Sequence, residues 1–191
     1  MQSTSSNNEY HRPGTWAWPL RLLHWLTVGL LVWQIVITLG PMNERGAFAM
    51  RWMPTHVSLG VAIFALCLCR MAFRFVTRAP QPQRPAAVAV HLALYASLLA
   101  LTATGWLGHQ PMPFMSTPKL FGYWPIPFAP KIPWLGTPRL LALHSALFWA
   151  FCGVVLVHVG AALVHLLLLR DGVFERMTTQ WQNRTSTAQK G

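Results

Sequence analysis

The sequence predicts an all-α membrane protein, a transmembrane four-helix bundle with both termini in the cytoplasm. Apolar residues make up 53% of the chain and charged residues only 10%, whereas a soluble domain carries about a quarter charged residues. Four apolar runs reach the length of about 20 residues that a helix needs to cross a bilayer. Histidines recur within these runs, where ionisable side chains are costly. Together these observations exclude a soluble globular domain.

The predicted spans lie at about residues 18–39, 56–76, 86–107 and 140–169. The first ends before Gly40-Pro41, and the second begins just after Pro54. The last contains no Lys, Arg, Asp or Glu, and as a helix it would be about 45 Å long, so it must tilt or extend beyond the bilayer. We expect one domain over residues 17–177, between polar tails at 1–16 and 178–191.

Positive charge dominates the chain, which carries fifteen Lys and Arg against four Asp and Glu. Nucleic acid is excluded as a partner, because the basic residues flank the apolar runs and do not gather on one solvated face. They indicate membrane topology and contact with anionic lipid. The positive-inside rule places both termini in the cytoplasm. That side holds Arg12, Arg21, Arg74, Arg78, Arg84, Arg170, Arg176, Arg184 and Lys190, and the other side holds Arg45, Arg51, Lys119, Lys131 and Arg139.

The connection from Gly108 to Pro138 is rich in proline and aromatic residues. Its prolines exclude a regular helix, and its aromatic residues suit the membrane interface. It is either a packed cap over the outer end of the bundle or a simple connector.

The histidines are the candidate functional residues of the spans. A single one is as often a hydrogen-bonded core residue as a ligand, so their arrangement decides. One, His56, lies at the mouth of the second span, and five lie within spans: His24, His91, His144, His158 and His165.

His144 and His158 lie fourteen residues apart on the fourth span. Fourteen residues turn a helix through about 1,400°, about 40° short of four turns, so both side chains leave the same face about 21 Å apart. They cannot bind the same metal ion. Each could bind a separate cofactor, one near each membrane face.

Each of these histidines needs a partner at a matching depth. With the termini inside, the first span begins at the inner face and the second at the outer face. Depth therefore pairs His24 with His158 and His56 with His144. Two bis-histidine pairs predict two haem b groups, bound non-covalently because the chain has no C-x-x-C-H sequence. A zinc site would instead need three or four converging ligands.

Arg70 lies inside the second span, fourteen residues after His56, and so on the same face one cofactor layer deeper. A buried Arg needs an anion, and no Asp or Glu lies in any span. A haem propionate would supply that carboxylate. The alternative is that Arg70 extends to a lipid phosphate.

These residues carry a resemblance to a known family. From about Trp18 to Met177 the chain resembles the prokaryotic cytochrome b561 family of four-helix, di-haem, quinone-linked cytochromes. The fourteen-residue histidine spacing is its specific signal. The matching segments are His24-Trp25, His56-Val57-Ser58 with Gly60, Arg70 and Arg74, His91 with Tyr95, and His144 and His158 followed by Ala161-Ala162-Leu163-Val164-His165.

The resemblance implies haem ligation by His24, His56, His144 and His158. It implies a multi-pass protein of the bacterial inner membrane that transfers electrons between ubiquinone and a donor at the outer face. Superoxide oxidation is an activity within the family, so superoxide:quinone oxidoreduction is one form of this function. The loop from His109 to Pro138 resembles the family only loosely, which leaves the donor site open.

Two further histidines have open roles. His165 follows His158 by two helical turns on the same face, and it could hydrogen-bond a quinone carbonyl or a haem propionate, or be structural. His91 has Tyr95 one turn away and is a weaker candidate.

Two other functions stay open. One is a haem-bearing anchor subunit that passes electrons between a dehydrogenase or hydrogenase partner and quinone, which a co-purifying redox partner protein would indicate. The other is a transporter or metal-site protein, which would lack a haem spectrum. Acid–base catalysis within the membrane is not expected, because the acids Glu9, Glu44, Asp171 and Glu175 all lie outside the spans.

Overall fold

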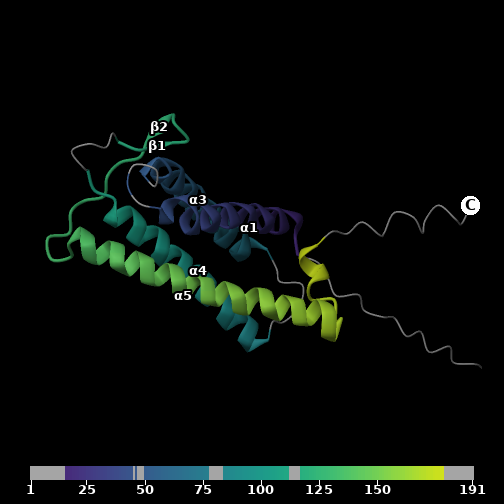
Figure 1. Ribbon diagram of the computed structural model, residues 1–191. Coiled ribbons are helices and arrows are strands. Elements are labelled where there is room, and N and C mark those ends of the chain that lie inside the picture. The colour runs from purple at the N-terminus through teal and green to yellow at the C-terminus, as the bar shows by residue number, and fades with distance from the viewer. Residues whose placement is uncertain (1–15, 45, 47–49, 78–83, 112–116, 179–191) are drawn as a thin grey trace, which may run out of the picture.

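The computed structural model describes residues 16–44, 46, 50–77, 84–111 and 117–178. The predicted tails therefore lie outside the described residues, except for Trp16 and Thr178. The long helices are α1 (Trp18–Leu39), α3 (Met53–Val76), α4 (Pro85–Gly108) and α5 (Thr137–Val164) (Figure 1). The short elements are the 3-10 helices η1 (Pro41–Asn43) and η3 (Glu175–Met177), the strands β1 (Lys119–Leu120) and β2 (Trp124–Pro125), and the π-helical turn η2 (His165–Leu169).

All four long helices have the length and composition to cross a membrane. The 22 residues of α1 and the 28 residues of α5 correspond to about 33 and about 42 Å of helix, against a hydrocarbon core of about 30 Å. The predicted fold class, an all-α transmembrane bundle of four helices, is confirmed.

A proline in the first turn begins each long helix. Proline suits this position because its fixed φ is helical and its missing N–H would have no partner there. This explains why α3 begins at Met53 and not at the predicted residue 56. Pro54 lies inside the first turn, where the prediction had placed it before the helix. The four residues are Pro19, Pro54, Pro85 and Pro138.

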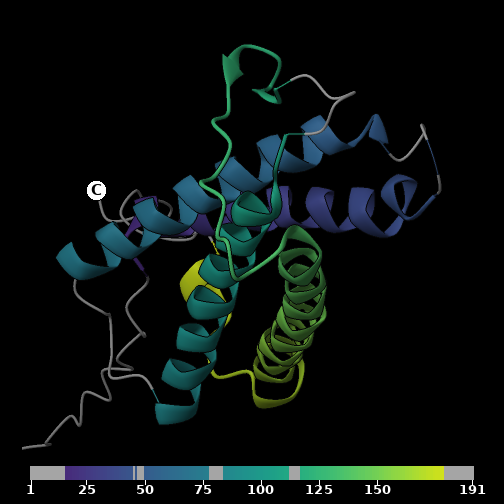
Figure 2. The same cartoon turned by 90° about the vertical axis from the view of Figure 1, so that its left-hand side faces the viewer.

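The helices pack as two pairs, α1 with α3 and α4 with α5, and α3 joins the pairs by contacting α4. Figure 2 shows the α1–α3 pair lying across the α4–α5 pair. We call the end with the starts of α1 and α4 and the ends of α3 and α5 the terminal end. The opposite end, beside β1 and β2, is the hairpin end (Figure 1).

The hairpin is fastened to the first turns of α3. Its turn has positive φ at Phe121 and Gly122, 47° and 88°, a conformation that glycine adopts readily. The Ser58 hydroxyl donates to the Lys119 carbonyl oxygen at 3.3 Å and accepts the Phe121 N–H at 3.0 Å. Trp106 Nε1 also donates to the Pro127 carbonyl oxygen at 2.9 Å. Over its described residues, the 108–138 connection is a packed cap.

A second set of contacts closes the terminal end. The Arg21 guanidinium donates to the Thr178 carbonyl oxygen at 2.6 Å, and Trp25 Nε1 donates to the Met177 carbonyl oxygen at 2.9 Å. Residues more than 150 positions apart in the chain are thereby joined. The segment after α5 thus lies against the start of α1.

The packed interior is small. Ile63 and Cys67 of α3, Leu98 of α4 and Phe151 of α5 form one buried cluster. Cys67 is a free cysteine buried among apolar residues. Most other large apolar side chains face outward, which suits lipid contact, since lipid tails are as apolar as a protein core. They include Trp33, Phe75, Trp149 and Leu156.

We predict that Ser58→Ala loosens the hairpin without affecting the helices. The Phe121 amide loses its acceptor, which costs about 1–2 kcal/mol, so its hydrogen exchange should accelerate about five- to thirtyfold. Exchange measured by mass spectrometry on the full-length protein in detergent checks this. Ser97→Ala is the matched control, because the Ser97 hydroxyl bonds only carbonyl oxygens of its own helix. Equal exchange in both variants would contradict the anchoring role.

Candidate functional site

Two pairs of imidazole rings face each other between the helices. At the hairpin end, His56 of α3 and His144 of α5 have ring centroids 6.1 Å apart. At the terminal end, the centroids of His24 of α1 and His158 of α5 are 6.4 Å apart. The structure therefore brings together the same two pairs that the depth argument predicted. Helix α5 contributes one ring to each pair.

The spacing within each pair suits a metal ion held between the rings. Imidazole nitrogens bind transition metals at about 2.0–2.1 Å. With about 1 Å from each nitrogen to its ring centre, the two centroids would lie about 6 Å apart, close to both observed distances. Among the described residues, no group of three or more His, Cys, Asp or Glu converges as a metal-ion site would need. The donor set therefore fits axial ligation of haem iron and does not fit a closed zinc site.

The hairpin-end pair has polar partners for its Nδ1 atoms. His144 Nδ1 lies 2.9 Å from the Leu101 carbonyl oxygen, which can only accept, so Nδ1 carries the proton. His56 Nδ1 lies 2.9 Å from Gln34 Nε2 and 3.4 Å from Thr38 Oγ1. A ring that holds its proton on Nδ1 leaves Nε2 free to bind a metal. At His144, Nε2 is therefore unprotonated and free to bind a metal.

At His56 the polar partner is a side-chain amide. The Gln34 oxygen is buried and has no hydrogen-bond partner among the residues that the structure describes, while the Gln34 nitrogen faces Nδ1. A half-turn of this amide would present the oxygen, an acceptor that matches a protonated Nδ1. Either arrangement ties α1 to α3 at the level of the hairpin-end pair.

The terminal-end pair has different surroundings. His24 Nδ1 is buried and has no hydrogen-bond partner within the described part of the chain. A third ring, His91 of α4, lies 5.5 Å from His158 between centroids. The ring of His158 therefore has one imidazole from α1 and one from α4 beside it, although the three rings do not converge on one point. An unpaired buried ring nitrogen is costly and marks this pair as a place where a further group would bind.

Arg70 lies in the terminal-end cluster. Its positive charge is close enough to act on His24, His91 and His158, and its guanidinium carbon lies 6.0 Å from the centre of the Tyr95 ring. Among the described residues, the ion pair joins His165 and Asp171, and no carboxylate pairs with Arg70. Arg70 is thus a cation in an apolar region that still needs an anion.

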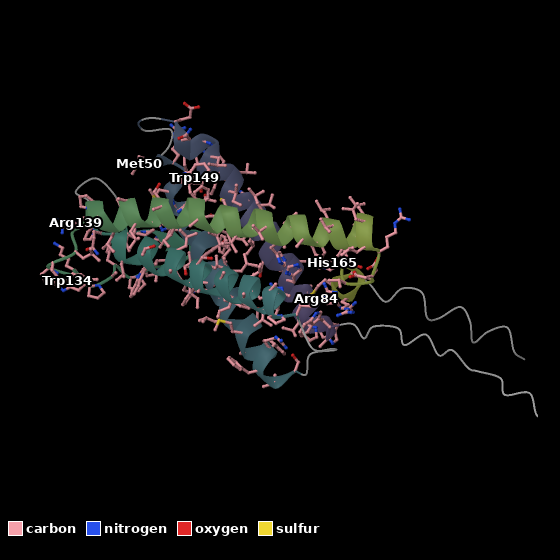
Figure 3. All side chains as sticks on the ribbon, turned by 90° about the horizontal axis from the view of Figure 1, so that it is seen from below. Met50, Arg84, Trp134, Arg139, Trp149 and His165 are labelled. Carbon is pink, nitrogen blue, oxygen red and sulfur yellow. The ribbon has the colours of Figure 1, made fainter. Side chains whose placement is uncertain are left out.

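His165 lies beyond this cluster, at the start of the π-helical turn η2. Its Nδ1 is 2.7 Å from a carboxylate oxygen of Asp171, and the other oxygen of Asp171 accepts the Val173 N–H at 3.2 Å. Figure 3 shows His165 and Arg84 at the terminal end, opposite Trp134 and Arg139. π-Helical turns are rare and often occur at functional sites.

Sequence reasoning missed several residues that contact the histidines. Gln34 is a polar residue inside an apolar span, and that signal could have identified it. The role of Leu101 had no signal, because its backbone carbonyl makes the contact and any residue carries one. Asp171 was noted only as an acid outside the spans.

Comparison with known proteins agrees with this geometry. A sequence model described as prokaryotic cytochrome b561 matches residues 15–180. A protein of Cereibacter sphaeroides named cytochrome b562 is 28% identical over 170 residues, which cover 81% of this chain and 89% of that protein.

The family match spans nearly the whole chain, including all four helices and both histidine pairs. The chain therefore belongs to the prokaryotic cytochrome b561 family: it is a multi-pass bacterial membrane cytochrome b, which binds haem and transfers electrons.

Proposed function

We propose that this protein is a di-haem, quinone-linked oxidoreductase that carries electrons across the bacterial inner membrane. The observation that carries the proposal is the pair of facing imidazoles at each end of the bundle, with centroids 6.1 and 6.4 Å apart. His56 and His144 would hold one haem b at the hairpin end. His24 and His158 would hold the other at the terminal end.

The protein's own residues would hold the haems and set their surroundings. When bound, haem supplies reversible one-electron transfer. In the membrane, the apolar helices would limit the access of water to both histidine pairs. The Leu101 carbonyl orients His144, and Arg70 would neutralise a propionate of the terminal-end haem. About 21 Å of α5 separates His144 from His158 along the helix axis, so the two pairs occupy different depths of the bilayer.

The terminal end would face the cytoplasm, in accordance with the basic residues that gather on that side of the sequence. In this orientation the hairpin end faces outward, where a donor such as superoxide would deliver electrons. Ubiquinone would accept them near His165. The hydrogen bond between His165 and Asp171 supports this role, because a carboxylate partner holds an imidazole in a fixed orientation toward a substrate.

We predict two non-covalent haems b per chain, lost one at a time by substitution. His56→Ala or His144→Ala should remove the hairpin-end haem, and His24→Ala or His158→Ala the terminal-end haem, because each haem would lose one of the two histidines that hold it. Pyridine haemochrome analysis gives the number of haems, and redox titration identifies the one that remains. One haem or none in the unmodified protein would contradict the proposal. So would loss of the same haem from His56→Ala and His158→Ala.

The Arg70 pairing predicts a redox shift confined to one haem. Arg70→Gln removes a positive charge from the terminal-end cluster, which favours the more positively charged oxidised haem and lowers its midpoint potential. The hairpin-end haem should shift much less, because it lies farther away. Potentiometric titration of both haems measures the two shifts.

Arg74→Gln is the matched control for this variant. It removes the same charge one turn farther along α3, where the guanidinium lies 4.6 Å from the centre of the Trp16 ring. An unchanged terminal-end potential in Arg70→Gln, or an equal shift in both variants, would indicate that Arg70 pairs with lipid and not with a propionate.

The quinone role of His165 predicts a kinetic change at one end only. Loss of one hydrogen bond of about 1 kcal/mol should slow re-oxidation of the reduced protein by a short-chain ubiquinone about fivefold in His165→Ala. Stopped-flow absorbance at the haem bands measures the rate. His109→Ala, at the hairpin end, should leave it unchanged. Equal slowing in both variants, with unaltered haem content, would place the quinone elsewhere.

A further inference from the structure

A glycine of α4 lies directly against the ring of His144. A Cβ atom at Gly105 would be 2.8 Å from His144 Cε1 and 3.1 Å from Nδ1, whereas carbon atoms in good contact lie about 3.5–4.0 Å apart. Any other residue at this position would therefore push the imidazole away. The absence of a side chain lets the α4 backbone approach the ring.

The same turn of α4 supplies the polar contact of this ring. His144 Nδ1–H donates to the Leu101 carbonyl oxygen at 2.9 Å, and Thr104 Oγ1 lies 3.4 Å from the same nitrogen. Leu101 precedes Gly105 by four residues, so its carbonyl also accepts the helical N–H of Gly105. Close approach at Gly105 is what brings this carbonyl within reach of the imidazole.

We propose that Gly105 is a positioning residue for the hairpin-end haem. It keeps His144 in hydrogen-bond contact with Leu101 and its ring opposite that of His56. The inference rests on the proposed ligand role of His144. A hydrogen bond from the distal nitrogen makes a ligating imidazole more basic, and a more basic ligand stabilises oxidised iron. Gly105 thereby lowers the potential of this haem.

A simpler role for Gly105 would be close packing between α4 and α5. Gly108 provides the comparison, because it lies one turn later on α4, where a Cβ would be 2.9 Å from Leu141 Cδ2. The two positions are equally crowded, but one adjoins the imidazole and the other a leucine. Gly105→Ala and Gly108→Ala therefore make the same chemical change with different neighbours.

The experiment compares both variants with the unmodified protein in full-length, haem-loaded form. Haem content, the midpoint potential of each haem and the low-spin EPR signals are measured. We expect Gly105→Ala either to lose the hairpin-end haem or to raise its potential and alter its EPR signal, while the terminal-end haem stays unchanged. Gly108→Ala should keep both haems with unchanged potentials.

Three outcomes would overturn the inference: an unaltered hairpin-end haem in Gly105→Ala, a downward shift of its potential, or the same change in both variants. His144→Ala separates this failure from failure of the proposed ligand set. If His144→Ala retains both haems, the ligand assignment itself is wrong. If it loses one haem while Gly105→Ala matches the unmodified protein, the assignment stands and the positioning role is wrong.

Discussion

An imidazole inside an apolar bundle has two ring nitrogens that need partners and cannot hydrogen-bond to water. The arrangement of the helices follows from this need for partners. Unpaired polar groups are costly in an apolar medium. Helix α5 carries His144 and His158 on one face, and α3 and α1 each bring a ring opposite one of them. Among the described residues, the other polar side chains beside these rings include Arg70, Gln34 and Thr104. The packing of the bundle is largely the means of holding these rings at two depths.

The two histidine pairs differ in the charges and dipoles around them. At the hairpin end, His144 donates to a carbonyl oxygen, which under the proposed ligation favours oxidised iron. At the terminal end, Arg70 lies beside the rings, and under the proposed ligation its positive charge would favour reduced iron. Both differences would raise the potential of the terminal-end haem relative to that of the hairpin-end haem. Under the proposed ligation, an electron that enters at the hairpin end would therefore be more stable at the terminal end.

Much of this organisation could be predicted from the sequence, because it depends on properties that are local along the chain. Apolar run length indicates the spans, and helical periodicity places His144 and His158 on one face. The parts that could not be predicted depend on how the backbones of different helices approach. The contacts of the Leu101 carbonyl and of Gly105 with His144 depend on how closely α4 approaches α5. The sequence gives no sign of that approach. The π-helical turn at His165 likewise has no periodic signal, since it departs from the helical repeat that the prediction relied on.

Because one ring of each pair lies on α5, both pairs are completed only at the end of synthesis of the helical domain. His24 and His56 lie in the first third of the chain, whereas their partners lie in its last helix. When α1, α3 and α4 have been inserted into the membrane, neither histidine pair is complete. A group held by both rings of a pair can therefore be captured only after the final helix has been inserted. Until then the growing chain has unmatched imidazoles in the bilayer at both depths.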